Sequence, residues 1–480
     1  MRPLRYATRT AILLPLLLAV AAGAGLQQDI ERTIAEAGFT NREVSVAVRE
    51  CGTDRLIAAV SASTPRMPAS NQKLLTAGVA AMVLGADFSF QTRLVRRGND
   101  LIVIGDGDPA LGDDLLLKKM TLPDGTTLTA TGLLDLWAAS VVNSGTRHVQ
   151  TLIVDDRIFD RDWYPEEWPK DQLQRHYCAA VGGINFNHNT VKLRPVPRGK
   201  GVDVSDMRPA YPNVVLDNQL KRGHGKDTSV IDPHRSEGSN EITLLGTVPV
   251  ATQKPVEVTI DNPPLQFGQL LATRLRLVGV AVDAVRLADA SDQPPSGVDV
   301  APPITTSIET VLERCNHDSD NMFAEALLKR IAHAVTGRQG TRADGSRIVT
   351  ATVERLTGST DGLRVADGSG MSRLNSISAR TLTAWLCRFD DSDPNQNLFI
   401  ESLAEKHEGT LKDRLASVDL HGATLRAKTG YIARVYAISG YVECPDGRRL
   451  AFSVLINTSK KRLTWKLRRG IVATIINQGC

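Results

Sequence analysis

Three short motifs constrain the possible folds of this chain more than any other sequence feature. They occur in the order Ser70-Asn71-Gln72-Lys73, Ser319-Asp320-Asn321 and Lys428-Thr429-Gly430. Each motif alone is short enough to arise by chance, but together they supply the parts of a nucleophilic site. The fold must therefore bring three distant segments together. Because residues 70 and 319 are 249 positions apart (319 − 70), we expect an inserted unit between the first two motifs.

The first motif has the spacing of a nucleophile and its base. Residues 70–85 carry apolar side chains at helical spacing, which predicts a helix with Ser70 at or near its first turn. Positions i and i+3 lie about 5–6 Å apart on one helix face, so the Lys73 amine can take the Ser70 proton. Lysine acts as a base near neutral pH only when burial or neighbouring positive charge lowers its pKa. The alternative is that Ser70 only caps its helix.

The second motif predicts proton relay and positioning. We expect Ser319 and Asn321 on a non-helical turn, with both side chains facing the cleft. Ser319 would relay a proton to the leaving group, and Asn321 would fix Lys73 and the substrate backbone. The alternative is that the motif only caps the helix predicted over 320–335.

The third motif lies in segment 424–432 (TLRAKTGYI), which we interpret as an edge strand. Lys428 would supply positive charge to a substrate carboxylate and Thr429 a hydroxyl, while Gly430 would let the backbone approach closely. The backbone N–H of Tyr431 would join that of Ser70 in binding the oxyanion. The alternative is an ordinary strand end.

The pattern of apolar residues outside the motifs predicts an α+β fold. Alternation and turn residues predict a β-hairpin over 42–49 and 56–61, and two further strands over 434–443 and 450–457. Short β-rich pieces fill the segment from about 90 to 262. Helical patterns occur at 265–279, 306–315, 320–335, 378–388 and 463–477. The terminal strands thus bracket a helical middle, as in a catalytic domain that an insertion divides.

The three motifs resemble those of the class C low-molecular-mass penicillin-binding proteins, the S13 peptidases. The resemblance extends over nearly all of the mature chain. It implies the serine β-lactamase/DD-peptidase-like transpeptidase fold, an antiparallel sheet flanked by helices. Residues 25–90 and 263–480 would form this catalytic domain, split by a large β-rich insertion over 91–262. Further matching segments are Gly105-Asp106-Gly107-Asp108-Pro109, Val154-Asp155-Asp156-Arg157-Ile158-Phe159, Ala324-Glu325, Asp367-Gly368-Ser369-Gly370-Met371-Ser372-Arg373 and Ser439-Gly440-Tyr441.

The resemblance implies a serine DD-peptidase that hydrolyses D-Ala-D-Ala termini of peptidoglycan through an acyl-enzyme. With a cross-linked substrate it would also cleave D-Ala–diamino-acid bonds. Its partners would be peptidoglycan stem peptides, with β-lactams as covalent inhibitors, and it would need no cofactor. The chain departs from the family at Tyr431, where a small residue is usual, so we expect a narrower substrate groove.

Two other functions remain open at this point. A β-lactamase would use the same attack with fast deacylation, but the 249-residue separation of the first two motifs argues against it. A non-catalytic peptidoglycan-binding protein would not need the intact pair of Ser70 and Lys73.

The N-terminus predicts export. Basic residues precede the apolar run 11–22, and Ala22-Gly23-Ala24 offers a cleavage point, so we interpret residues 1–24 as a signal peptide. The run is shorter than the ~20 residues that span a bilayer, although a retained anchor is the alternative. We expect a periplasmic or extracytoplasmic protein, with no transmembrane segment in the mature chain. The 57 Lys and Arg nearly balance the 53 Asp and Glu, without a basic block, which argues against nucleic acid as a partner.

The six cysteines of an exported chain permit disulfides, and their spacing does not choose the pairs. In the fold that the resemblance implies, the first and last strands pair antiparallel. Cys51 and Cys444 would then meet at one sheet edge, and we expect a disulfide between them. The alternatives are that both stay reduced or that either pairs with Cys480. No CxxC or HExxH spacing occurs, so we expect no metal site.

An acidic cluster stands in the middle of the expected insertion. One of its carboxylates could pair with the free amino group that wall peptides carry on their diamino acid. The alternative is that all are solvated turn residues. The cluster consists of Asp155, Asp156, Asp160 and Asp162.

Overall fold

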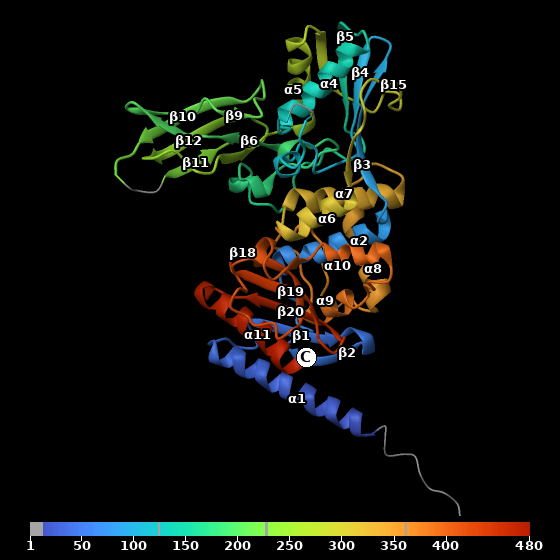
Figure 1. Cartoon of the computed structure of the whole chain (residues 1–480), viewed down its shortest axis with the longest axis vertical. Coiled ribbons are helices and arrows are strands. Elements are labelled where there is room, and N and C mark those ends of the chain that lie inside the picture. Colours follow the sequence, from blue (N-terminus) through green and yellow to red (C-terminus); the bar gives the residue numbers. More distant parts are fainter. Residues whose placement is uncertain (1–12, 123–124, 226–228, 361) are drawn as a thin grey trace, which may run out of the picture.

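The computed structural model describes residues 13–122, 125–225, 229–360 and 362–480, and for residues 13–24 the backbone alone. Figure 1 shows a lower body, in which a sheet lies between helices, and an upper, inserted body that rises from it. A smaller set of strands projects sideways from the upper body. This arrangement agrees with the predicted α+β domain divided by an insertion.

The sheet of the lower body is antiparallel throughout. Its first and last strands in sequence lie side by side, with Val44 opposite Ile456 and Glu50 opposite Leu450. The predicted hairpin and the predicted pairing of these strands are both confirmed. In spatial order the strands are β17 (Ala404–Glu405), β18 (Thr424–Ile432), β19 (Val435–Glu443), β20 (Arg449–Asn457), β1 (Val44–Glu50) and β2 (Arg55–Val60).

Two terminal helices cover one face of this sheet, α1 (Leu13–Glu36) and α11 (Thr464–Gly479). Leu26 and Ile30 of α1 pack there in a core shared with alternate residues of the central strands. Residues 1–12 of the expected signal peptide lie outside the described residues. Among the residues that are described, no helix is long and apolar enough to cross a bilayer.

The other face of the sheet packs against a layer of helices and carries the main core of the catalytic domain. Polar side chains cap five of these helices, because each accepts a hydrogen bond from a backbone N–H of the first turn. The caps are Ser307, Asp320, Thr341, Ser378 and Asp393. The helices are α2 (Lys73–Leu84), α6 (Ile308–His317), α7 (Asn321–Thr336), α8 (Arg342–Thr357), α9 (Ala379–Leu386) and α10 (Pro394–Glu401).

The inserted body is built on a mixed sheet that has its own core. Its helices are α3 (Asp114–Leu117), α4 (Ala130–Asn143) and α5 (Pro263–Leu277). The sheet runs in the order β14 (Ala281–Leu287), β5 (His148–Asp155), β4 (Asp100–Ile104), β3 (Ser89–Arg97) and β15 (Val298–Asp299).

Smaller sheets form the part that projects sideways in Figure 1. One contains β10 (Val215–Arg222), β12 (Glu241–Val248) and β11 (Val230–His234), and another contains β13 (Val256–Thr259), β6 (Thr190–Leu193) and β9 (Met207–Arg208). A separate hairpin joins β7 (Val196–Arg198) to β8 (Gly201–Asp203).

The inserted body ends later in the sequence than the expected residue 262. Helix α5 packs into the core of the inserted sheet through Phe267 and Leu271, and β14 pairs with β5. The chain returns along β16 (Ile304–Ser307), which pairs antiparallel with the outgoing β3. The helical period at 265–279 predicts a helix but carries no information on which sheet the helix covers.

The cysteine pairing differs from the expected one. Cys51 is bonded to Cys387 and Cys444 to Cys480, while Cys178 and Cys315 are buried free thiols. Cys444 follows β19, and β20 lies between β19 and β1. Two strand spacings, about 10 Å, therefore separate it from the end of β1, beyond the ~7 Å between Cα atoms that a disulfide tolerates. The expectation of a Cys51–Cys444 bond was wrong, and the alternative pairing of Cys444 with Cys480 is the one observed.

We predict that peptide mapping without reduction will recover linked peptides for Cys51–Cys387 and Cys444–Cys480. Cys387 follows α9, which packs on β1 and β20, so its thiol lies beside the end of β1. Cys178 and Cys315 should be alkylated only after denaturation, since both are buried and burial raises the pKa of each thiol to about 12. Recovery of Cys51 linked to Cys444 would contradict the strand order.

Candidate active site

Ser70 and Lys73 lie at the start of helix α2, as predicted. Ser70 lies in a short 3₁₀ turn, Ala69–Gln72, that leads directly into the helix. Lys73 Nζ lies 3.2 Å from Ser70 Oγ. The lysine is fully buried whereas the serine is partly exposed, so a substrate can reach the hydroxyl but not the amine. Burial lowers the pKa of Lys73 from its ordinary value, which favours the neutral base.

Asn321 of the second motif contacts the same amine. Its Oδ1 lies 2.7 Å from Lys73 Nζ, and its Nδ2 donates to the Tyr177 carbonyl oxygen at 2.8 Å. Asp320 caps α7 by accepting hydrogen bonds from Met322 and Phe323 N–H groups, so Asn321 is the first residue of that helix. The second motif thus both caps helix α7, through Asp320, and places Asn321 against Lys73, as two separate interpretations of the sequence had suggested. Ser319 precedes them in a left-handed backbone conformation, with φ 62°.

A loop that the motif analysis assigned no role supplies the third contact of Lys73. The Ser369 carbonyl oxygen accepts from Lys73 Nζ at 2.8 Å. Glu325 Oε1 accepts the N–H groups of Gly368 and Ser369 at 2.9 Å each. Burial and the nearby Asp367 raise the pKa of Glu325. The segments around Asp367 and Glu325 matched the family, but only their folded contacts reveal this bracing of the loop.

Strand β18 places the third motif beside Ser70. Asn71 Nδ2 donates to the Lys428 carbonyl oxygen at 3.1 Å. A Cβ on Gly430 would lie 2.8 Å from the Pro68 carbonyl oxygen and 2.9 Å from Asn71 Oδ1, so only glycine fits without a shift. Lys428 is fully buried, and burial followed by the charge of Lys73 holds its pKa well below the ordinary value.

Thr429 and Tyr431 point to the opposite face of β18 from Lys428, because side chains alternate along a strand. Thr429 Oγ1 donates to Thr410 Oγ1 at 2.8 Å. Tyr431 is about half exposed, and its ring lies 5.4 Å from that of Tyr436. The structure therefore brings all eight predicted site residues to one end of α2, one end of α7 and the adjacent strand edge.

The inserted body braces this site. Besides the contact from Tyr177 to Asn321, Trp168 Nε1 donates to Asp367 Oδ2 at 3.0 Å. Asp367 also accepts the N–H groups of Gly370 and Ser372, in the loop that holds Lys73. Sequence patterns did not indicate these contacts, because they join residues that are 199 and 144 positions apart in the chain.

The acidic cluster is engaged within the chain. Asp160 pairs with Lys329 at 2.7 Å and Asp162 with Arg342 at 2.6 Å, so both tether the insertion to catalytic-domain helices. The other two carboxylates pair with basic neighbours, Asp155 with Arg157 and Asp156 with Arg161. Tethering by Asp160 and Asp162, and pairing within the insertion by Asp155 and Asp156, therefore replace the substrate-binding role that we considered for these acids.

His188 links the insertion to the second motif. Its Nδ1 lies 3.1 Å from Asp320 Oδ2 and its Nε2 lies 2.9 Å from Asp113 Oδ2. Arg314 also binds Asp113 at 2.8 Å, and the Phe323 ring packs beside the imidazole. Burial alone would lower the pKa of His188, but the two carboxylates outweigh it and raise the pKa to about 9.

We predict that this link weakens as the pH rises from about 6.5 to about 9. The folded pKa exceeds the unfolded value of about 6.5, so the stabilisation is complete below pH 6.5 and is lost as pH rises through about 9. Its size is on the order of 1–3 kcal/mol. In urea unfolding at pH 7, His188→Asn should have a lower free energy of unfolding than wild type. At pH 10 the difference between the two free energies should be smaller. His148→Asn, which alters an exposed His148–Asp283 pair, serves as control. A gap that is constant with pH would contradict the prediction.

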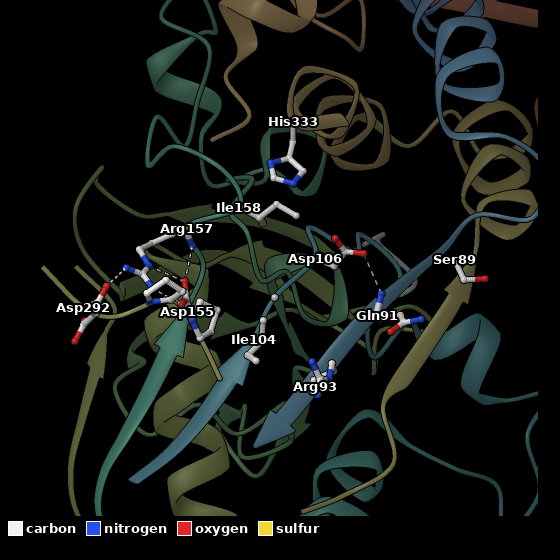
Figure 2. A pocket seen from close by; sticks show the side chains of 13 residues that line it. Ser89, Gln91, Arg93, Ile104, Asp106, Asp155, Arg157, Ile158, Asp292 and His333 are labelled. Carbon is white, nitrogen blue, oxygen red and sulfur yellow. Dashed lines mark hydrogen bonds and ion pairs between the residues drawn. The ribbon is translucent and has the colours of Figure 1, made fainter. Parts of the chain in front are cut away.

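A cavity of about 640 Å³ lies away from these residues, between the inserted sheet and the C-terminal half of α7 (Figure 2). His333, on its rim, is 12 residues along α7 from Asn321, about 18 Å of helix. Charged side chains that line the cavity are paired, Arg157 with Asp155 and Arg93 with Asp299. Among the described residues, no group of three or more His, Cys, Asp or Glu side chains could hold a metal ion.

The fold and the site define a class of protein. Strand β18 is second in its sheet rather than the expected edge strand, because the two-residue strand β17 pairs with its Arg426 and Ala427. A serine and a buried lysine at the start of a helix, beside such a strand of an antiparallel sheet, characterise the serine acyl-enzymes that include β-lactamases and penicillin-binding proteins. A model of the family described as D-Ala-D-Ala carboxypeptidase 3 (S13) matches residues 26–475. The chain belongs to this family, and it is a serine-type D-Ala-D-Ala carboxypeptidase.

Individual relatives agree with this assignment. The D-alanyl-D-alanine carboxypeptidase of Actinomadura sp. (strain R39) is 31% identical over 474 residues, covering 92% of this chain and 83% of that protein. DacB of Haemophilus influenzae is 22% identical over 86% of this chain and 85% of its own.

Solved structures share the fold. The crystal structure of penicillin binding protein 4 (dacB) from H. influenzae superposes with a TM-score of 0.74 at 20% identity, covering 90% of this chain and 96% of that one. A structure of the same protein complexed with a novel β-lactam gives a TM-score of 0.70 at 20% identity and covers 94% and 99% of the two chains.

Proposed function

We propose that Ser70 is the nucleophile of a DD-carboxypeptidase reaction and that Lys73 is its base. The contacts of Lys73 carry this proposal. A neutral amine has two N–H groups and one lone pair, and two of its three neighbours, Asn321 Oδ1 and the Ser369 carbonyl oxygen, can only accept hydrogen bonds. The lone pair is then left for the third neighbour, the Ser70 hydroxyl.

In the first step, Lys73 takes the Ser70 proton while Oγ attacks the carbonyl carbon of the penultimate D-alanine. The backbone N–H groups of Ser70 and Tyr431 bind the oxyanion of the tetrahedral intermediate. The C–N bond then breaks. The proton that Lys73 took from Ser70 passes through Ser319 to the departing nitrogen, so that D-alanine leaves as a neutral amine. Water hydrolyses the resulting ester and restores Ser70.

The leaving residue explains the third motif. D-alanine carries a carboxylate one residue beyond the scissile carbonyl, and β18 runs along this part of the substrate. Lys428 supplies positive charge from beneath the strand, Thr429 supplies a hydroxyl, and Gly430 permits the close approach. When the leaving group is instead the side-chain amine of a second stem peptide, the same steps cleave a cross-link, which is endopeptidase action.

The proposed setting is outside the cytoplasm, with residues 1–24 acting as a removable signal peptide. Stem peptides of peptidoglycan are then the substrates, and β-lactams acylate the same serine as covalent inhibitors. A β-lactamase would use the same chemistry but release the hydrolysed drug rapidly.

The experiment that tests this function compares two substrates of one enzyme. We expect release of D-alanine from a pentapeptide ending in D-Ala-D-Ala, and stoichiometric acylation by penicillin with slow release. Rapid multiple turnover of penicillin without release of D-alanine would instead establish the β-lactamase alternative. A cross-linked muropeptide dimer in the same assay measures the endopeptidase share.

Lys428 gives a further prediction. If its charge acts on the terminal carboxylate, Lys428→Ala should reduce kcat/KM for a peptide ending in D-Ala-D-Ala more than for its uncharged amide. A difference of about tenfold is expected for one charge–charge interaction of roughly 1.4 kcal/mol. Equal losses would mean that Lys428 acts on Lys73 instead, the neighbouring charge with the largest effect on its pKa.

A further inference from the structure

A guanidinium without an acidic partner lies beside Thr429. Arg414, in the loop before β18, has its NH1 3.4 Å from Thr429 Oγ1. Across the part of the chain that the structure describes, no carboxylate lies within ion-pair distance of this side chain. Partial desolvation lowers the pKa of Arg414, and no acidic group opposes this shift. An arginine held in this state favours an external anion.

The neighbouring cations deepen this imbalance. Lys428 is buried beneath the strand, and Arg468 is buried in α11. Burial and the charge of Arg414 lower the pKa of Arg468 to about 9. Arg468 Nε and NH1 donate only to carbonyl oxygens, those of Thr464 and Ala437. Arg414 thus has two basic neighbours, Lys428 and Arg468, and within the described chain no carboxylate forms an ion pair with any of the three.

The Trp465 ring holds Arg414 in place. Its guanidinium lies 5.0 Å from the centre of the Trp465 ring, and that of Arg468 lies 3.5 Å from the same ring. Arg468 also lies 5.5 Å from the Tyr436 ring, which pairs across the strands with Tyr431. Stacking orients a planar guanidinium without neutralising its charge, so the N–H groups remain available for a planar anion.

We propose that Arg414, together with the Thr429 hydroxyl, binds the C-terminal carboxylate of the substrate. This inference rests on the proposed function, since the carboxylate is that of the leaving D-alanine. Consecutive Cα atoms are about 3.8 Å apart, so this group lies one residue from the scissile carbonyl. Thr429 is two residues from Tyr431, about 7 Å along the strand, so Arg414 lies within reach of that carboxylate. Lys428 then supplies the field from below, and Arg414 makes the direct contact.

The test compares an acyl-D-Ala-D-Ala peptide with its C-terminal amide. Arg414→Gln should lower kcat/KM for the acid by about 10- to 100-fold, the range for a hydrogen bond to a charged group, mainly through KM. For the amide, kcat/KM should stay within about threefold of wild type, which also shows that the variant is folded. Arg414→Lys should recover part of the loss, because it restores charge without the planar fork.

Lys412→Gln is the matched control, since it removes an exposed cation two residues away in the same loop. It should leave kcat/KM unchanged for both the acid and the amide. Equal losses of Arg414→Gln on acid and amide, or no loss on either, would overturn the proposed carboxylate contact. If wild type cleaves neither peptide, the proposed function fails first, so the two failures are distinguishable.

Discussion

Ser70→Ala should show no covalent labelling by penicillin and no release of D-alanine. The variant removes a single oxygen atom from a partly exposed side chain at a helix start, so the fold should be unchanged. Without Oγ no acyl-enzyme can form, and neither the lysine nor the oxyanion N–H groups can replace it. Fluorescent penicillin on a denaturing gel, with D-alanine release measured in parallel, provides the readout.

Ser63→Ala is the matched control for this variant, because Ser63 is an exposed serine seven residues earlier that binds only Arg380. It should label and turn over like wild type. Undiminished labelling of Ser70→Ala would remove Ser70 from the mechanism.

Lys73→Ala should slow acylation by ~10² or more, the low end for loss of a general base. In the proposed mechanism Lys73 Nζ, 3.2 Å from Ser70 Oγ, accepts the hydroxyl proton, so its removal leaves the hydroxyl without that acceptor. Because burial lowers the pKa of Lys73, wild-type acylation should persist well below pH 10.5 and decline only as the amine becomes protonated. The variant should lose this pH dependence. Stopped-flow acylation across pH measures both effects.

Lys329→Met controls for the loss of a buried lysine. Lys329 is also fully buried, and burial lowers its pKa. It pairs with Asp160, and it lies eight residues, about 12 Å, along α7 from Asn321. It should lose stability but keep its acylation rate when folded. An equal kinetic loss in both variants would show that Lys73 matters only as a packed side chain.

The catalytic motifs were predictable because their chemistry depends on local spacing. Ser70 and Lys73 meet through one turn of helix, and the short apolar segments 434–443 and 450–457, joined by a Pro-Asp-Gly turn, are enough to predict the strands β19 and β20. The resemblance supplied the pairing of β1 with β20. These features depend on a few residues close together in sequence, or on a fold already known.

The predictions of the domain boundary and of the cysteine pairing were wrong, because both depend on which segments distant in sequence pack together. The helical period in α5 does not indicate that it covers the inserted sheet, so the predicted boundary at residue 262 was early. Likewise, Cys51 bonds to Cys387 because α9 packs on β1, which no local pattern reveals.

The bracing of the site was missed for the same reason. Glu325 and Asp367 resemble ordinary acids in sequence, yet their carboxylates bind the backbone of the loop that holds Lys73. Tyr177 contributes only a carbonyl oxygen, which any residue possesses. The sequence signal for these two acids was that each lies in a segment that resembles the family. That resemblance did not indicate which groups the carboxylates bind.

The central claim is that Ser70 becomes acylated beside Lys73, and the site of attachment tests it most directly. Wild-type protein treated with penicillin should be digested and its peptides analysed by mass spectrometry. We predict one adduct, carrying the mass of the intact drug, on the hydroxyl of Ser70, and slower formation of this adduct in the presence of excess D-Ala-D-Ala substrate analogue. An adduct on Ser319 or on any other residue, or stoichiometric inactivation without an adduct, would contradict it.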